Sequence, residues 1–321
     1  MKLILFLAAF IGLMVLIQWR ASAHEARAEA QNPPAGEFVE VEGTRVHYRV
    51  MGSGPDLILL HGASGNMEDF TMGFADRLKD RYRVILFDRP GLGWTERPEG
   101  HGGFWRNREE TPKDQAALLQ KAADVIGVKN PIVLGHSFGG IVALAWGLAR
   151  PEQTAAVVLV SAVAEPWPGE LGWTYTVNGS LLGGALFVPM ITAFVPEPYI
   201  IDSIESVFEP QTAPEGYAEH LGVGLTLRRH SLRANAQQVN ALRPHVVEMK
   251  KQYGGLTLPI EAVHGDADTI VPLNVHARVL MEDVPNGALK VLPGEGHMPQ
   301  HTAPEEVIAA IDRAAARAGL R

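Results

Sequence analysis

The sequence predicts an α/β fold in which helices cover a mostly parallel central sheet. Short apolar runs recur without the apolar–polar alternation of half-exposed strands, and such runs are typical of strands buried on both faces. Helical stretches separate many of these runs, which is the order of elements in a parallel sheet covered by helices. One long segment, residues 165–257, contains no run of this kind.

The predicted strands begin with a hairpin and continue as buried runs. Phe38–Val41 and Val46–Val50 alternate apolar and polar residues on either side of Gly43, which indicates a β-hairpin. The buried strands that follow are Leu57–Leu60, Val84–Phe87, Ile132–Leu134, Val157–Val160, Ile260–Val263 and Leu289–Leu292. Helices are expected at Ala116–Ile126, Gly139–Ala149, Ala277–Asp283 and Pro304–Ala318.

The segment from Glu165 to Thr257 is too long to be a structureless loop inside a compact domain. It contains helical pieces at Ile200–Phe208 and Leu232–Leu242 and is rich in aromatic residues. We therefore expect a helical cap insertion that folds over the sheet. The expected organisation is an N-terminal anchor or signal plus linker (1–36), a first core part (37–164), the cap (165–257) and a second core part (258–321).

The N-terminus carries an unbroken apolar run, Leu3–Ile17, followed by Trp19 and Arg20. A spanning helix needs roughly 20 apolar residues and a secretory signal roughly 7–15, so the run lies at the boundary between the two. It favours an uncleaved single helix that associates the protein with a membrane. Export after cleavage at one of the small-residue motifs, Ala21–Ala23 or Ala26–Ala28, is the alternative. The stretch His24–Gly36 is interpreted as a linker.

Composition excludes several classes of function. With 28 Lys+Arg against 36 Asp+Glu, the net charge of −8 gives no basic surface for binding nucleic acid. The absence of cysteine excludes disulfides, thiolate metal sites and a cysteine nucleophile. No cofactor and no metal is expected, and the oligomeric state stays open.

The strongest chemical signal is the sequence Gly135-His136-Ser137-Phe138-Gly139-Gly140. It follows a buried strand and precedes a helix of small residues, which is the context of a nucleophile elbow. The tight turn pushes the Ser137 hydroxyl out of the sheet. Gly135 and Gly139 are needed because side chains there would collide. The amide of Phe138, the residue after the nucleophile, is one expected donor to an oxyanion.

A serine nucleophile needs a base and an acid that orients the base, and both follow in the sequence. The strand Ile260–Val263 leads to Asp266 and Asp268, and the strand Leu289–Leu292 leads to His297. All of them lie just past the carboxyl ends of strands, where open α/β sheets place their sites. His297 is the expected base, and both carboxylates are candidates for the acid.

These motifs resemble those of the α/β-hydrolase superfamily, in its cap-bearing branch of serine esterases, carbon–carbon bond hydrolases, epoxide hydrolases and haloalkane dehalogenases. The resemblance rests on Leu60-His61-Gly62, Asp88-Arg89-Pro90-Gly91-Leu92-Gly93, the Ser137 elbow, and the loops of Asp268 and His297. It implies Asp268 rather than Asp266 as the acid, and Ala63 as the second backbone donor of the oxyanion hole. We expect Asp88 and Arg89 to hold a sharp turn rather than to react with substrate.

The identity of the nucleophile narrows the function. Epoxide hydrolases and haloalkane dehalogenases use aspartate at the elbow, whereas Ser137 implies an acyl-enzyme. The main hypothesis is hydrolysis of a carboxylic ester of an apolar, modest-sized small molecule. The alternatives are a carbon–carbon bond hydrolase of diketone-type substrates, in which Arg228 and Arg229 bind a carboxylate, and a protein of this fold that only binds ligands.

Overall fold

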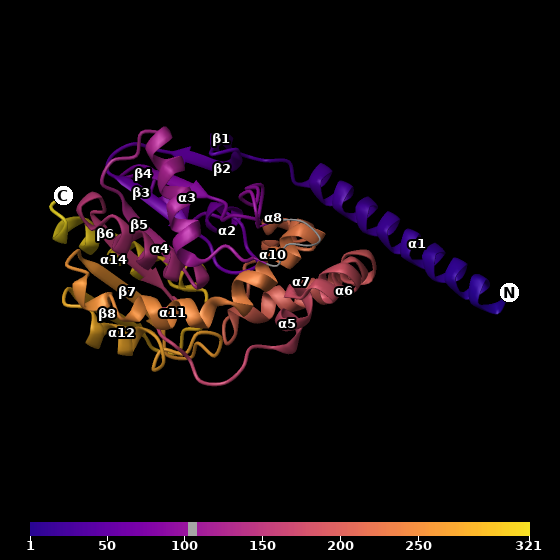
Figure 1. Ribbon diagram of the computed structural model, residues 1–321. Coiled ribbons are helices and arrows are strands. Elements are labelled where there is room, and N and C mark those ends of the chain that lie inside the picture. The colour runs from indigo at the N-terminus through magenta and orange to yellow at the C-terminus, as the bar shows by residue number, and fades with distance from the viewer. Residues whose placement is uncertain (102–107) are drawn as a thin grey trace.

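The computed structural model describes residues 1–101 and 108–321. Its centre is one sheet in the order β1-β2-β4-β3-β5-β6-β7-β8 (Figure 1). The first hairpin and the β2–β4 pair are antiparallel, and the remaining pairs are parallel. The predicted mostly parallel sheet is thus confirmed. The strands are β1 (Glu37–Val41), β2 (Thr44–Met51), β3 (Asp56–Leu60), β4 (Arg83–Phe87), β5 (Ile132–His136), β6 (Ala156–Val160), β7 (Ile260–Gly265) and β8 (Gly287–Leu292).

Apolar side chains cover both faces of the sheet, which explains why the central strands show no alternation. Along β3, Ile58 and Leu60 pack on the face of α3 and α4, whereas Leu57 and Leu59 pack on the face of α14. The helices of the core are α2 (Glu68–Thr71), α3 (Pro112–Val125), α4 (Phe138–Ala149), α12 (Ala277–Asp283), α13 (Pro299–Thr302) and α14 (Pro304–Arg317). Short 3-10 helices lie at Ala75–Arg77 and Pro151–Gln153.

The helix α3 begins earlier than predicted. Its first turn is set by Thr111, whose side chain accepts from the Asp114 amide while the Asp114 carboxylate accepts from the Thr111 amide. This capping box and Pro112 at the first helical position start the helix before its apolar face begins at Ala116.

Residues 165–257 contain helices and no strand. The chain enters the segment after β6 and leaves it into β7, so it sits above the carboxyl ends of the parallel strands. The helices are α5 (Trp173–Gly179), α6 (Leu181–Phe194), α7 (Glu197–Glu205), α8 (Tyr217–Leu221), α9 (Val223–Thr226), α10 (Arg229–Asn240) and α11 (Leu242–Lys250), with 3-10 turns at Ser206–Phe208 and Tyr253–Gly255. The helices α5 to α8 and α10 lie between the sheet and α1, whereas α11 lies beside β7 and β8 (Figure 1).

The N-terminus forms one continuous helix, α1 (Lys2–Gln31), whose first half projects away from the rest of the molecule (Figure 1). It is long and apolar enough to cross a membrane, or to act as a signal sequence. The predicted linker was wrong for residues 24–31, which continue this helix and contact α9. Alanine-rich segments with Glu and Arg form helices readily, and packing against the cap stabilises this one.

Candidate active site

Ser137 lies on a strained turn between β5 and α4. Its backbone has φ 51° and ψ −118°, a conformation that is costly for any residue with a side chain. The neighbouring glycines are required by space. A Cβ on Gly135 would lie 2.2 Å from the Gly139 carbonyl oxygen, and one on Gly139 would lie 2.2 Å from the Leu60 carbonyl oxygen. The elbow thus holds Ser137, the candidate nucleophile, at the end of β5 and at the start of a helix.

The structure brings together Asp268 and His297, which come from the loops after β7 and β8. His297 Nδ1 donates to Asp268 Oδ2 over 2.8 Å, and both side chains are buried. Since an ionised carboxylate only accepts hydrogen bonds, the proton of the ring sits on Nδ1 and leaves Nε2 free to accept one.

The Asp268 carboxylate is held in its charged form. Burial alone would raise its pKa, but hydrogen bonds from His264 and His297 and from the backbone of Val271 bring the pKa well below its usual range. Its Oδ1 accepts the amides of Ile270 and Val271, each over 2.9 Å. The Asp268 carboxylate is therefore an ionised and fixed orienting group at neutral pH.

Asp266, the other candidate acid, has a different role. It is exposed, and its carboxylate accepts the amide of Gly294 over 2.7 Å. This bond ties the loop after β7 to the loop after β8. Asp266 thus braces the two loops and does not contact the imidazole of His297 through any hydrogen bond in the described residues.

A cavity of about 400 Å³ lies between the core and the cap, and both Ser137 and His297 line it. The core also contributes Gly62, Ala63 and Met298. Most of the remaining wall is apolar and comes from the cap, including Tyr175, Ile200, Ile204, Val207, Phe208 and Leu232. Such a chamber suits an apolar group of modest size next to the nucleophile.

The two segments that carry the expected oxyanion donors both lie next to Ser137. Phe138 is the first residue of α4, where backbone N–H groups have no acceptor within the helix. Ala63 lies in the loop after β3 and lines the cavity. A Cβ on Gly62 would lie 3.2 Å from the Ser137 Cβ, so glycine lets this loop approach the nucleophile. The N-terminus of α4 also favours negative charge here.

The cap clamps the loop after β3 that carries Ala63, which we call the oxyanion loop (residues 61–65) after its expected role. Sequence analysis did not predict this clamp. Ser64 donates its amide to Asn235 Oδ1 over 2.7 Å, and Asn235 Nδ2 donates to Ser64 Oγ over 2.8 Å. Thr226 donates its hydroxyl to the Ser64 carbonyl over 2.7 Å. Ser64, with φ 57°, is thereby fixed as a turn residue. The partners were missed because they lie far away in the sequence, in a segment without a recognisable motif.

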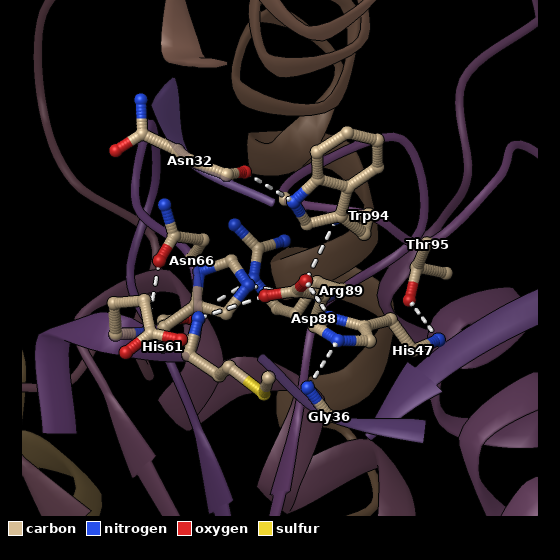
Figure 2. A network of polar contacts seen from close by, with 12 residues as sticks. Asn32, Gly36, His47, His61, Asn66, Asp88, Arg89, Trp94 and Thr95 are labelled. Atoms are coloured by element: carbon tan, nitrogen blue, oxygen red, sulfur yellow. Dashed lines mark hydrogen bonds and ion pairs between the residues drawn. The ribbon is translucent and has the colours of Figure 1, made fainter. Parts of the chain in front are cut away.

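Arg89 reaches beneath this loop from the turn after β4 (Figure 2). Its Nε donates to the His61 carbonyl and its Nη2 to the Gly62 carbonyl, each over 2.9 Å. The guanidinium also lies over the Phe138 ring, 4.3 Å from its centroid. Burial lowers the Arg89 pKa to about 9, so the group is a cation at neutral pH. One side chain therefore touches both segments that carry the expected oxyanion donors.

Asp88 organises the same turn and does not line the cavity (Figure 2). Its carboxylate accepts the amides of Met67 and Trp94 and lies 2.7 Å from His47 Nδ1. A Cβ on Gly93 would collide with this carboxylate, which explains the glycine. The geometry agrees with the expected structural role of Asp88.

A buried polar cluster next to His297 was not predicted. Asp69 accepts from Tyr217 over 2.6 Å and lies 2.8 Å from His301 Nε2. His136 donates from Nε2 to the His297 carbonyl over 2.9 Å, and burial lowers the His136 pKa to about 4, so the ring is neutral. The hydrogen bond from His136 fixes the carbonyl of His297. Asp69 carried no sequence signal because it lies in a short helix outside the recognised motifs.

Arg228 and Arg229 do not line the cavity. Arg228 is buried, donates to the Gly93 carbonyl and pairs with Glu29 over 3.1 Å. Arg229 pairs with Glu25 over 2.6 Å. Both arginines therefore face α1, and neither is placed to bind a substrate carboxylate. Within residues 1–101 and 108–321, no group of three or more His, Asp or Glu side chains is arranged to hold a metal ion.

Comparison with known proteins agrees with this geometry. The model of the alpha/beta hydrolase family matches residues 57–310. A curated relative, the 2-hydroxymuconate semialdehyde hydrolase of Pseudomonas putida, is 24% identical over 286 residues, covering 85% of this chain and 91% of the relative.

Solved structures show the same fold. An esterase from Exiguobacterium antarcticum superposes with a TM-score of 0.69 at 20% identity, covering 87% of this chain and 99% of that one. A membrane phospholipase A, described as a bacterial virulence factor, superposes with a TM-score of 0.62 at 20% identity. This superposition covers 98% of this chain and 97% of the phospholipase chain. At 98% coverage, the second superposition includes most of α1.

Proposed function

Because this chain belongs to the alpha/beta hydrolase family and is a hydrolase, we propose that it cleaves carboxylic esters through an acyl-enzyme formed on Ser137. The observation that carries the proposal is the strained Ser137 elbow, which opens into the same cavity as His297, the ring that is hydrogen-bonded to Asp268. Strain of this kind persists only where the surrounding structure enforces it, and it aims the hydroxyl at the cavity.

In the proposed mechanism, Ser137 Oγ attacks the ester carbonyl while His297 Nε2 takes its proton. The negative charge that develops on the carbonyl oxygen is stabilised by the amides of Ala63 and Phe138. The imidazolium of His297, held by Asp268, protonates the ester oxygen of the leaving group as its bond to the carbonyl carbon breaks, and the alcohol departs. Water then attacks the acyl-enzyme with His297 again as the base, and Ser137 is regenerated.

An ester is favoured over other substrates by the cavity and by the comparisons. The wall of the cavity is mostly apolar, and the esterase from Exiguobacterium antarcticum shares the fold of this chain. The second candidate is a carbon–carbon bond hydrolase, because a relative carries the name 2-hydroxymuconate semialdehyde hydrolase. The positions of Arg228 and Arg229 count against it, since neither lines the cavity.

A substrate panel tests the proposal. We expect the protein to hydrolyse soluble 4-nitrophenyl esters of two to eight carbons, and a serine-directed fluorophosphonate to stop the reaction while adding its mass to the tryptic peptide that contains Ser137. Turnover of a vinylogous diketone with negligible ester hydrolysis supports the second candidate. Ester hydrolysis that survives complete labelling contradicts the mechanism, and absence of both turnover and labelling supports a ligand-binding protein.

We also propose that α1 stays attached as a membrane anchor. Its second half packs as a structural helix: Ala21 is fully buried beside Ala193, and Ala28 lies against Gly224, where a Cβ would approach within 2.8 Å. The small residues that suit a signal peptidase thus also allow close helix packing. Cleavage after Ala28 would also remove Glu25 from its ion pair with Arg229.

The state of the N-terminus can be measured directly. In the membrane fraction, after an alkaline carbonate wash, we expect the protein isolated by gel electrophoresis to yield the tryptic peptide Ala21–Arg27, which the isolated chain contains only if neither small-residue motif is cut. Soluble protein whose first peptide begins at His24 or Glu29 contradicts a retained anchor. A carbonate-soluble protein that still contains Ala21–Arg27 contradicts the membrane association alone.

A further inference from the structure

The cap presents apolar side chains to the outside next to α1. Residues 171–196 include no Asp, Glu, Lys or Arg, although they form surface helices. Several large apolar side chains of this region and of α7 are exposed, led by Leu182 at 76% and Trp173 at 70%. We call this set the cap apolar face: Trp173, Leu182, Leu186, Phe187, Met190 and Tyr199.

Soluble surfaces scatter such residues singly, so a cluster on consecutive elements points to a partner. On α6 the exposed residues recur at spacings of three and four, which places them on one side of the helix. The other side, with Val188, Thr192 and Ala193, is buried. The α6 part of the face is therefore one continuous side of a helix and not a set of isolated positions.

The position of α6 along α1 identifies the partner. Ile17 and Ala21 pack against Ala193, and Arg20 donates from Nε to the Ala193 carbonyl over 3.4 Å. The Arg20 guanidinium lies 4.9 Å from the Phe194 ring centroid. Trp19 and Arg20 end the apolar half of α1, and such residues mark the boundary between hydrocarbon and headgroups. The end of α6 is thus fixed at the level of that boundary.

The helix α6 is too short to cross the membrane. Its 14 residues span about 21 Å, against a hydrocarbon core of about 30 Å. It also meets α5 at a bend of 106°, so the two do not form one straight span. A short apolar helix at this level lies in the interface plane, with its exposed side in the acyl region.

The rim of the cavity is adjacent to the cap apolar face. Tyr199 belongs to the face, and the next residue, Ile200, lines the cavity with Ser203 and Ile204 of the same helix, α7. Ser203 is exposed, so this part of the wall is also at the surface. A molecule held at the cap apolar face therefore has a short path to Ser137.

We propose that the cap apolar face rests in the surface of the bilayer that α1 anchors, and that the active-site cavity takes an amphiphilic acyl ester, a membrane lipid, from that bilayer. The substrate part of this inference rests on the ester hydrolase function proposed above. The docking part rests on α1, α6 and α7 alone.

Depth measurement tests the docking independently of activity. The chain has no cysteine, so a single introduced cysteine carries a fluorophore at one position. Full-length protein with Leu182→Cys is reconstituted in phosphatidylcholine–phosphatidylglycerol vesicles. We expect nitroxide-labelled lipid to quench the probe and iodide not to reach it. The control, Glu152→Cys, lies exposed before β6, on the side of the sheet away from the cap, and should show the reverse.

Other outcomes overturn the docking. Quenching by iodide at position 182 as strong as at position 152 shows that the face is in water. Protection from iodide without quenching by the nitroxide lipid shows that protein, such as a second copy of the chain, covers the face instead of lipid. Both results leave the proposed hydrolase function intact.

A charge on the face tests the substrate route. We expect Leu182→Glu to lower hydrolysis of 4-nitrophenyl palmitate dissolved in the vesicles by about tenfold, because the charge lifts α6 from the acyl region. Hydrolysis of soluble 4-nitrophenyl butyrate should not change. The matched control is Val125→Glu. Val125 is an exposed apolar residue of α3, outside the cap, and this substitution should leave both rates unchanged.

The two arms separate the possible failures. Equal loss for both esters, or the same loss with Val125→Glu, overturns the lipid route. If nitroxide-labelled lipid quenches the probe at position 182 but the protein hydrolyses neither ester, the proposed hydrolase function and the lipid substrate are overturned. The proposed docking of the cap apolar face in the bilayer stands in that case.

Discussion

Replacing Asp268 by asparagine lowers kcat for a soluble acyl ester by about 10⁴-fold and leaves the fold intact. The asparagine side chain has nearly the same shape, but it offers His297 an amide in place of a carboxylate. The ring then loses the partner that holds its proton on Nδ1 and stabilises the imidazolium. The measurement is kcat and KM at neutral pH, with circular dichroism to establish that the variant is folded.

Two further variants bracket this result. Asp266→Asn is the matched control: it removes a charge two residues away that braces the Gly294 amide, and it should change kcat by less than about threefold because it does not touch His297. Ser137→Ala should give the lowest rate, about 10⁶-fold below wild type. A large loss of kcat with Asp266→Asn and a small one with Asp268→Asn would contradict Asp268 as the acid of the triad and assign that role to Asp266.

The core was predictable because its strands are buried on both faces. Runs such as Val157–Val160 have no polar position, and few structures other than a covered parallel sheet accommodate several such runs in one chain. The order of strands and the register between them follow from contacts distant in sequence, which local patterns do not contain. The start of α3 at Pro112 was missed although its capping box is local and readable.

The second half of α1 was predicted to be a linker because the composition of a segment does not show which other segment packs against it. His24–Gln31 alternates small and charged residues, which reads as a linker when nothing packs against it. In the structure Ala28 meets Gly224 of α9, and Glu25 and Glu29 meet Arg229 and Arg228. Pairings at that sequence distance leave no trace in either segment alone.

Sequence reasoning placed Ser137, Asp268, His297, Ala63 and Phe138 by motif, and the structure brings Ser137, His297 and Ala63 to one cavity with Asp268 behind His297. It did not find the residues that position them. Asn235 and Thr226 act from the cap on a loop more than 160 residues before them. Such partners have no fixed spacing, because only the folded chain sets their distance.

Arg89 is the positioning residue with the largest expected effect. Arg89→Lys should lower kcat for a soluble ester by about 10²- to 10³-fold with little change in KM, the loss expected when one oxyanion donor is misplaced. Lysine keeps the charge but lacks the planar fork that holds the His61 and Gly62 carbonyls together. These carbonyls belong to the segment that presents the Ala63 amide, so the donor shifts while the apolar wall of the cavity stays.

A purely structural role of Arg89 makes a different prediction, and Arg97→Lys separates the two. Arg97 is also largely buried and bonds Glu110 and Gln237, but it does not contact the oxyanion loop through any hydrogen bond among the described residues. Each lost hydrogen bond to a buried group costs about 1–3 kcal/mol of unfolding free energy, so both variants should show lower melting temperatures. Only Arg89→Lys should also lower kcat and slow labelling of Ser137 by the fluorophosphonate, because only its guanidinium spans the carbonyls before Ala63 and the ring of Phe138. Equal kcat for the two folded variants would leave Arg89 as a stabilising residue alone.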